Sequence, residues 1–368
     1  MLNAFIPNGM GKNKPINIAK NTLLLLVSTI ISLVILELGI RVFIPQDKKI
    51  TWIEMHERGF VMNQSGGSSF QEFGERRAEY KFTEQRLRTG ISANQDSSAY
   101  KILAIGDSYT FGLLLDESDT YMHHLQIWAD SSLSEPVLFL NAAVGGSGMA
   151  DWPAWLDTFG SNIEPDMVLY FMNNNDVFRA LSKNLFVLDN GELTSSQRWK
   201  PTSFSQKINT RNWYRYLQAH SELMNLIVKV LWKYAYFDDL THSFDPQKTE
   251  VVIPDTSSFN PSNSYSLELS KSLIHSMESW CSENTCTFVL ANTGYLDKSL
   301  ADDHTYQTHQ YYSESERPYL NIQSCVSEAV DGDYTTIQIP IDLHPNELGA
   351  QIIADCIAKQ LPDFLPFQ

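Results

Sequence analysis

Residues able to carry out nucleophilic chemistry stand in four short, widely separated stretches of the sequence. The stretches are GDSYTFG at 106–112, NAAVGGSG at 141–148, NNND at 173–176 and DLHPN at 342–346. The hydroxyl of Ser108 is a poor nucleophile until a base removes its proton, and His344 offers such a base. An imidazole base needs an orienting acceptor, and Asp342 is the nearest carboxylate in the sequence.

The glycine-rich and asparagine-rich stretches supply what acyl transfer needs besides a nucleophile and a base. A tetrahedral intermediate requires hydrogen-bond donors aimed at its oxyanion, and a glycine N–H on a tight loop and an Asn side-chain amide are such donors. Each stretch alone has an ordinary explanation, because glycines make turns and Asn or Asp caps helices. The four stretches in combination indicate acyl transfer.

The elements that must position these residues are short apolar runs separated by helix-like stretches. The expected strands are 101–106, 137–142, 167–172, 287–292 and 335–341, and the expected helices are about 119–130, 151–161, 265–281 and 346–360. Strands alternating with helices indicate a parallel sheet with helices on both faces. The four reactive stretches fall at the C-terminal ends of expected strands or just beyond them, where ligands bind in open α/β sheets.

On these four ordered blocks, over about residues 100–360, the sequence resembles the SGNH, or GDSL-type, hydrolases. The resemblance implies a three-layer α/β/α domain with a flavodoxin-like parallel five-stranded sheet. It also implies that Ser108 is the nucleophile and His344 the general base. The oxyanion hole would then comprise the Ser108 N–H, the Gly146 N–H and the Asn175 side-chain amide. We expect no cofactor and no metal.

The sequence departs from the usual family pattern at two positions. Asn173 stands where the family usually has glycine, two residues before the block-three Asn. The common Asp-x-x-His spacing is here Asp342-Leu343-His344, and position 341 is Ile. Because Asp-x-His occurs in related SGNH-like acyltransferases, we assign Asp342 as the orienting acid. The alternative is a dyad in which His344 leans on a backbone carbonyl.

A membrane anchor is expected near the N-terminus. Residues 22–44 are mostly apolar, with only Glu37 and Arg41 charged, and roughly 20 mostly apolar residues cross a bilayer. A cleaved signal peptide would have a shorter apolar core and a small-residue cleavage site, so we expect an uncleaved anchor. Glu37 and Arg41, four residues apart, could pair or snorkel.

The charges flanking the span are nearly balanced and leave its orientation open. Lysines precede the span at 12, 14 and 20, and basic residues follow its apolar part at 41, 48 and 49. The expected function and the cysteines favour residues 1–21 as a cytoplasmic tail and the remaining body outside the membrane. The protein would then be a single-pass membrane protein with an extracytoplasmic catalytic domain.

The expected domain organisation beyond the anchor has two parts. Residues 45–99 are polar and suggest a juxtamembrane connector, and residues 100–368 form the hydrolase domain with a helical insertion at about 177–264. The aromatic-rich stretch 211–237 in this insertion is expected to pack over the sheet or cap the active-site rim. A second membrane contact is the alternative for this stretch.

Composition and cysteines limit the class of protein. The net charge is -16 at pH 7, which argues against a nucleic-acid partner, because phosphate binding requires a basic surface. The four cysteines allow three sets of disulfide pairings. Cys281 and Cys286 are close enough in the sequence to bridge a helix end to the next strand. The other two are Cys325 and Cys356. Disulfides fit an exported domain.

The sequence therefore predicts a membrane-anchored serine esterase. Its substrate would be an O-acyl ester, for example an O-acetyl group on a cell-envelope glycan, since tethering suits a surface-bound polymer. An O-acyltransferase that passes the acyl group to a sugar hydroxyl is the first alternative. A catalytically inactive glycan-binding module is the second.

Overall fold

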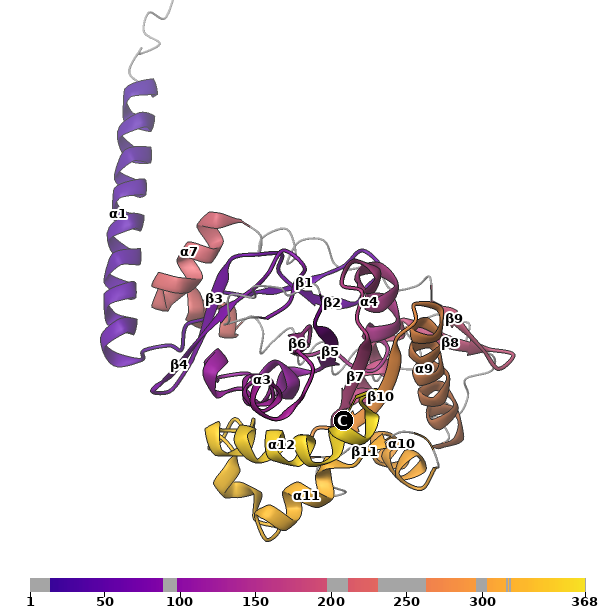
Figure 1. Ribbon diagram of the computed structural model, residues 1–368. Helices are drawn as coiled ribbons and strands as arrows, with labels where there is room; N and C mark the ends of the chain where they lie inside the picture. The colour runs from indigo at the N-terminus through magenta and orange to yellow at the C-terminus, as the bar shows by residue number, and fades with distance from the viewer. Residues whose placement is uncertain are drawn as a thin grey trace, which may run out of the picture.

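The computed structural model describes residues 14–88, 98–196, 211–230, 263–295, 303–315, 317 and 319–367. Most of the expected cytoplasmic tail and much of the expected insertion lie outside the described residues. The main body contains a parallel sheet between two helical layers, and one long N-terminal helix stands apart from it (Figure 1).

The central sheet has five parallel strands in the flavodoxin-like order β11-β10-β7-β5-β6. The strands are β5 (Tyr100–Gly106), β6 (Val137–Asn141), β7 (Met167–Met172), β10 (Thr287–Asn292) and β11 (Tyr319–Leu320). Four of them match the expected apolar runs. The expected three-layer α/β/α fold with this sheet is therefore confirmed.

The fifth strand is not where the sequence predicted it. Residues 335–341 were expected to form a strand, but the chain there forms a short 3-10 helix, η3 (Tyr334–Ile337), followed by a loop. Pro340 cannot donate to a ladder, and the Ile339 N–H donates to the His344 carbonyl instead. The predicted strand is therefore wrong. Ile337 and Ile339 are buried, which accounts for the alternating apolar pattern, but neither residue pairs with a strand of the sheet.

Helices cover both faces of the sheet because the strands carry apolar side chains on both faces. On β5, Leu103 and Ile105 belong to one buried cluster, and Ile102 and Ala104 belong to the other. The first cluster includes side chains of α4 (Asp151–Phe159), α5 (Asp176–Lys183), α9 (Asn263–Glu283) and α10 (Asp303–Ser313). The second includes side chains of α3 (Tyr121–Ser132), α11 (Ile322–Ala329) and α12 (Glu347–Gln360).

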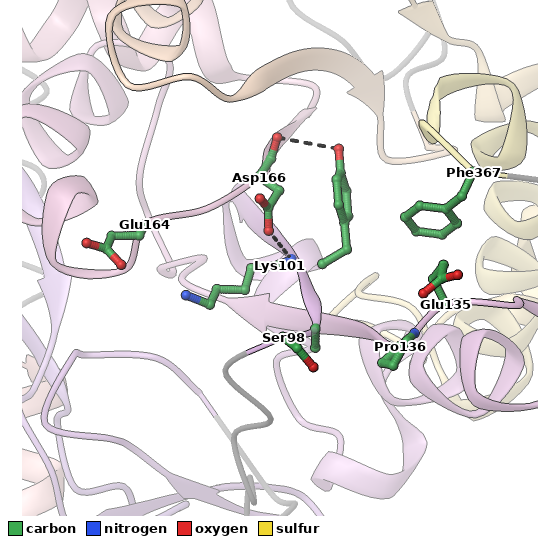
Figure 2. Close-up of a pocket in the computed structure, with 9 residues that line it drawn as sticks. Ser98, Lys101, Glu135, Pro136, Glu164, Asp166 and Phe367 are labelled. Atoms are coloured by element: carbon green, nitrogen blue, oxygen red, sulfur yellow. Dashed lines mark hydrogen bonds between the residues drawn. The ribbon is translucent and has the colours of Figure 1, made fainter.

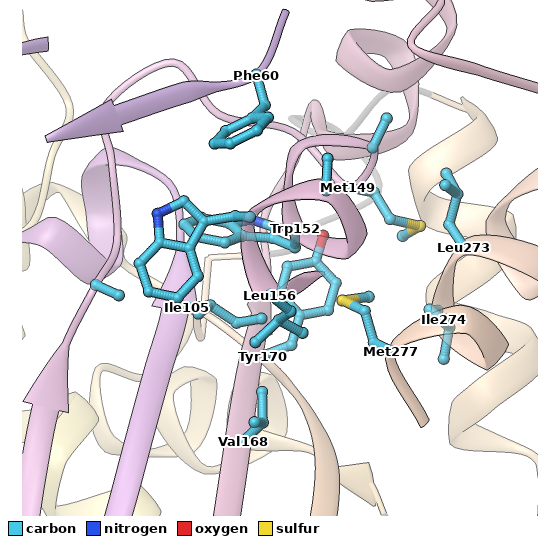
Figure 3. Packing of buried hydrophobic residues seen from close by; sticks show 14 of the residues in the cluster. Phe60, Ile105, Met149, Trp152, Leu156, Val168, Tyr170, Leu273, Ile274 and Met277 are labelled. Atoms are coloured by element: carbon cyan, nitrogen blue, oxygen red, sulfur yellow. The ribbon is translucent and has the colours of Figure 1, made fainter. Parts of the chain in front are cut away.

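The segment after the N-terminal helix is folded onto the body rather than being a simple connector. It forms two hairpins, β1 (Ile53–Met55) with β2 (Val61–Asn63) and β3 (Ser68–Phe73) with β4 (Arg76–Lys81). Phe60 is fully buried in the core cluster that also contains Trp152 and Tyr170 (Figure 3). Arg88 is also buried, and its guanidinium donates to the carbonyls of Phe111, Gly112 and Leu115. The expected boundary at residue 99 is therefore not a structural boundary.

The described part of the expected insertion is only partly helical. After α5 the chain forms a hairpin, β8 (Phe186–Asp189) with β9 (Glu192–Ser195). It continues in α7 (Asn212–His220) and a further helix over residues 222–230. These last two helices contact the N-terminal helix near its C-terminal end (Figure 1).

The N-terminal helix, α1 (Lys14–Phe43), contains a stretch from Lys20 to Phe43 that is long and apolar enough to cross a membrane. Within its most apolar window, no residue is buried against the body. Glu37 and Arg41 form an ion pair with an N–O distance of 2.9 Å, which is the pairing that their spacing of four residues suggested.

The four cysteines form two disulfides. Cys281–Cys286 joins the last turns of α9 to the residue before β10, as the spacing suggested. Cys325–Cys356 joins α11 to α12. Both pairs therefore connect elements of the main domain.

Candidate active site

Ser108 lies immediately beyond the C-terminal end of β5, where it begins the short helix α2 (Ser108–Phe111). The Asp107 carboxylate caps this helix by accepting a hydrogen bond from the Tyr109 N–H at 2.9 Å. Gly106 makes the turn possible, because a Cβ there would lie 2.4 Å from the Thr110 hydroxyl and 3.1 Å from the Phe171 carbonyl. The Gly-Asp-Ser sequence thus sets the position of the serine.

Ser108, His344 and Asp342 form a continuous hydrogen-bonded chain. The Ser108 Oγ lies 2.7 Å from His344 Nε2, and His344 Nδ1 lies 2.5 Å from Asp342 Oδ1. With Asp342 as a carboxylate acceptor, the proton resides on Nδ1, so Nε2 is free to accept from the serine hydroxyl. The arrangement is that of a nucleophile, a general base and an orienting acid.

The loop that carries Asp342 and His344 has an unusual backbone. Ile341 and Leu343, on either side of Asp342, have φ values of 73° and 71°, in the left-handed region that side chains rarely adopt. The Leu343 N–H donates to the Ile339 carbonyl at 2.8 Å, which closes the loop. This tight turn allows an acid only two residues from the histidine to reach its Nδ1.

Tyr109, the residue after the candidate nucleophile, fixes that loop from the other side. Its hydroxyl donates to the Leu343 carbonyl at 3.1 Å, and its ring centroid lies 4.8 Å from that of the His344 imidazole. Burial raises the pKa of Tyr109, with the nearby Asp107 and Asp342 carboxylates adding to the effect, so its hydroxyl stays a donor. Sequence reasoning missed this residue.

Besides the Ser108 N–H, the candidate oxyanion donors lie on loops that follow β6 and β7, the two strands that flank β5. A Cβ at Gly145 would lie 3.9 Å from the Ser108 Cβ, so the glycine loop passes close to the serine. Gly146 follows with φ 77°, and its carbonyl accepts from Lys183 Nζ at 2.9 Å. Asn175 is the N-cap residue of α5, and its side chain is exposed and makes no capping hydrogen bond.

A buried polar network beneath the serine includes residues that the sequence analysis did not assign. The Asp107 carboxylate accepts from Arg179 Nη1 and from Asn173 Nδ2, both at 2.8 Å. The Asn173 side-chain carbonyl in turn accepts from the Thr293 hydroxyl at 3.0 Å. Asn173 therefore links the ends of β7 and β10 to the turn that carries Ser108. In the sequence, the run of three asparagines at 173–175 was the feature that could have indicated this network.

Asp176 belongs to the same network and is fully enclosed. It accepts from the Tyr170 hydroxyl at 2.7 Å and from the Asn173 N–H at 3.0 Å. Burial, together with the nearby negative charge of Asp107, raises the pKa of Asp176 to about 8. For Arg179, the attraction of Asp107 and Asp176 outweighs burial and raises the pKa of the guanidinium.

A separate pocket lies at the opposite edge of the sheet. Its volume is about 460 Å³, and it is lined by the N-terminal ends of strands, including Tyr100 and Lys101 of β5 and Asp166 before β7 (Figure 2). Because Ser108 follows the C-terminal end of β5, this pocket is not part of the candidate site. Among the described residues, no group of three His, Cys, Asp or Glu side chains could hold a metal ion.

Comparison with known proteins gives structural likeness only. No protein-family model and no curated protein sequence matches the chain. The chain is similar in structure to TesA (12% identity, TM-score 0.41, covering 72% of this chain and 99% of that one). It is also similar to a lipolytic protein of the G-D-S-L family from Desulfitobacterium hafniense (13%, TM-score 0.40, 71% and 98%). A third similar structure is an acetylxylan esterase from Geobacillus stearothermophilus (14%, TM-score 0.40, 72% and 94%).

Proposed function

We propose that the protein is a membrane-anchored serine ester hydrolase that works through an acyl-serine intermediate. The observation that carries this proposal is the hydrogen-bonded chain from Asp342 through His344 to Ser108, with distances of 2.5 and 2.7 Å. The serine lies at the C-terminal edge of a flavodoxin-like sheet, where open α/β folds bind ligands.

In the proposed reaction, the Ser108 oxygen attacks the ester carbonyl carbon while His344 Nε2 takes the hydroxyl proton. The negative charge on the carbonyl oxygen is stabilised by the backbone N–H groups of Ser108 and Gly146 and by the Asn175 amide. His344 then gives its proton to the alcohol oxygen as the ester bond breaks. The alcohol departs, and the acyl group remains bound to Ser108. Water then attacks the acyl carbon while the same imidazole takes its proton. His344 returns that proton to the Ser108 oxygen as the acyl–oxygen bond breaks, which releases the acid and restores the serine.

Asp342 acts through His344 in this scheme. Its carboxylate holds the tautomer that presents Nε2 to the serine and stabilises the imidazolium formed during attack. Both side chains are largely shielded from solvent, with exposures of 15% for His344 and 16% for Asp342. Limited water access strengthens the interaction between the two charges.

The location of the domain supports the proposed substrate class. The apolar α1 supports a single-pass anchor, and the two disulfides support an oxidising, extracytoplasmic compartment for the body. In this topology the N-terminus is cytoplasmic and the catalytic domain faces the cell envelope. An O-acyl ester, such as an O-acetyl group on an envelope glycan, is the substrate we propose.

An O-acyltransferase is the second candidate. The observation in its favour is the Asp-x-His spacing at 342–344, which resembles that of related SGNH-like acyltransferases. The chemistry is the same up to the acyl-serine, and a sugar hydroxyl then replaces water as the second nucleophile.

Aryl esters of graded acyl length test the proposed function. The purified full-length protein should hydrolyse at least the acetyl ester and be labelled by a fluorophosphonate. Ser108→Ala should abolish both, whereas Ser131→Ala, at an exposed serine of α3, should change neither. Labelling of the alanine variant at the parental level would rule out Ser108 as the nucleophile.

Two further outcomes of this assay separate the alternatives. Added sugar acceptors would divert acyl groups from free acid to sugar ester if the protein is a transferase. A folded parent that hydrolyses none of the esters and takes no label would favour a glycan-binding module.

A further inference from the structure

The last turns of α1 hold a helical segment from a distant part of the chain. We call residues 211–230 the arm; it contains α7 and the helix over residues 222–230. The Glu37 carboxylate accepts from the N–H groups of Glu222 and Leu223, both at 2.9 Å, and from the Ser221 hydroxyl at 2.8 Å. A carboxylate at the first N–H groups of a helix stabilises that helix end.

Two further contacts tie the same junction to α1 and to the start of the body. Arg41, paired with Glu37, donates to the His220 carbonyl at 2.7 Å. The buried Glu222 carboxylate accepts from the Gln46 N–H at 2.7 Å and pairs with Lys48 at 2.9 Å. The junction of the two arm helices is therefore fixed against α1.

The arm exposes apolar and aromatic side chains that the body does not cover. In the helix over residues 222–230, Glu222 is the one buried residue, although most of the helix is apolar, and Ile227 and Val230 are each 44% exposed. In α7, Trp213 and Tyr216 are 57% and 63% exposed. A helix that is apolar on most sides is normally buried in protein or in lipid.

The position of the junction along α1 indicates which surroundings cover the exposed side chains of the arm. Glu37 precedes Phe43, the end of α1, by six residues, or roughly 9 Å of helix. The arm therefore meets α1 inside the stretch that is long and apolar enough to span a membrane. At that depth an adjoining helix lies at the membrane interface, where Trp and Tyr are enriched.

We propose that the arm is a second membrane contact, lying in the interface beside α1 with its apolar side chains in a lipid bilayer. This inference rests on the proposed anchoring by α1. The body would then be docked on the membrane at two points rather than held by a single tether. An interfacial helix of this kind binds through its buried apolar area, and Trp, Leu and Ile provide that area.

Site-specific fluorescence in liposomes tests this inference on the full-length chain. All four native cysteines are in disulfides, so single cysteines at exposed positions can take an NBD probe. The positions are Ile227 and Tyr216 in the arm, Leu33 in α1 and, as the control, Ile127 on α3, which is 54% exposed. The liposomes contain lipids with doxyl groups at shallow or deep positions.

The expected result is a blue-shifted emission and loss of fluorescence with shallow doxyl lipid at positions 227 and 216, and no loss at position 127. Loss at position 33 alone would overturn the second contact while leaving the anchor in place. A blue shift at position 227 without doxyl quenching would mean that protein covers the arm, which also overturns it. Aryl-ester turnover by the same samples is a separate readout, because it reports on Ser108 and not on lipid contact.

Discussion

At the scale of single residues, the feature that sets this site apart is an acid two positions before its histidine. The left-handed Ile341 and Leu343 turn the chain so that Asp342 and His344 meet. Each such residue costs on the order of 1–3 kcal/mol and persists only where its surroundings hold it. Tyr109 is part of those surroundings, since its hydroxyl bonds the Leu343 carbonyl.

The role of Asp342 can be tested by removing its charge. Asp342→Asn should lower kcat by up to ~10⁴-fold, because the wrong tautomer is favoured and the imidazolium loses its partner. That loss equals roughly 5 kcal/mol of barrier. His344→Ala should cost at least as much. If Asp342→Asn keeps activity within about threefold of the parent, a backbone carbonyl orients the histidine instead.

The pH dependence of stability tests the enclosed Asp176. Its pKa of about 8 lies above the value near 4 of an unfolded Asp, so the folded protein holds a proton that the unfolded chain releases between these values. The stability contributed by this group is therefore complete below about pH 4 and is lost as pH rises toward 8.

Urea unfolding of parent and Asp176→Asn at pH 5 and pH 8 measures this effect. The parent should lose stability between the two values, and the variant should lose less, since Asn cannot release a proton. Equal losses in the two proteins would contradict the raised pKa.

The residues of the candidate site stand in short sequence patterns, but the residues that support them do not. Ser108 and His344 stand in short stretches whose residue types limit the possible chemistry. Arg179 and Tyr109 are common residue types in a helix, and only the folded chain places them against Asp107 and Leu343. Contacts between residues far apart in the sequence leave no local pattern.

At the scale of elements, the buried strands were predictable because continuous apolar runs of strand length mark them. The edge strand β11 contains only Tyr319 and Leu320 and is too short to show a pattern. The fifth strand was therefore predicted at residues 335–341 instead. The hairpins over residues 53–81 were missed because their sequence is mostly polar. Their few apolar side chains pack on distant elements.

Phe60 tests whether this N-terminal segment belongs to the fold. Phe60→Ala removes a fully buried ring from the main core and should cost about 3–5 kcal/mol. Phe178→Ala, at a side chain that is 45% exposed, is the matched control and should cost much less. Thermal unfolding of the full-length proteins measures both. A Phe60 variant as stable as the control would show a loosely attached connector.

At the scale of the whole molecule, one apolar helix and two disulfides define the proposed topology. If α1 is retained as an anchor, the protein should stay with membranes after a high-salt wash, and protease added outside the inner membrane should digest the body. Maleimide should modify the four cysteines only after reduction, because all are paired. A soluble body beginning beyond residue 44, or thiols reactive without reductant, would contradict this topology.

The packing of the first hairpin against the glycine loop has a consequence for how far the site can reach. Ile53 Cδ1 lies 3.4 Å from where a Gly145 Cβ would be, and that position is 3.9 Å from the Ser108 Cβ. Ile53 lies ten positions after Phe43 in the chain, so a chain stretched between them spans at most about 36 Å. An anchored enzyme of this build would work only within a thin shell above the lipid surface. Its encounters with an immobile polymer would then be governed by lateral diffusion and by the spacing between membrane and polymer, not by bulk concentration.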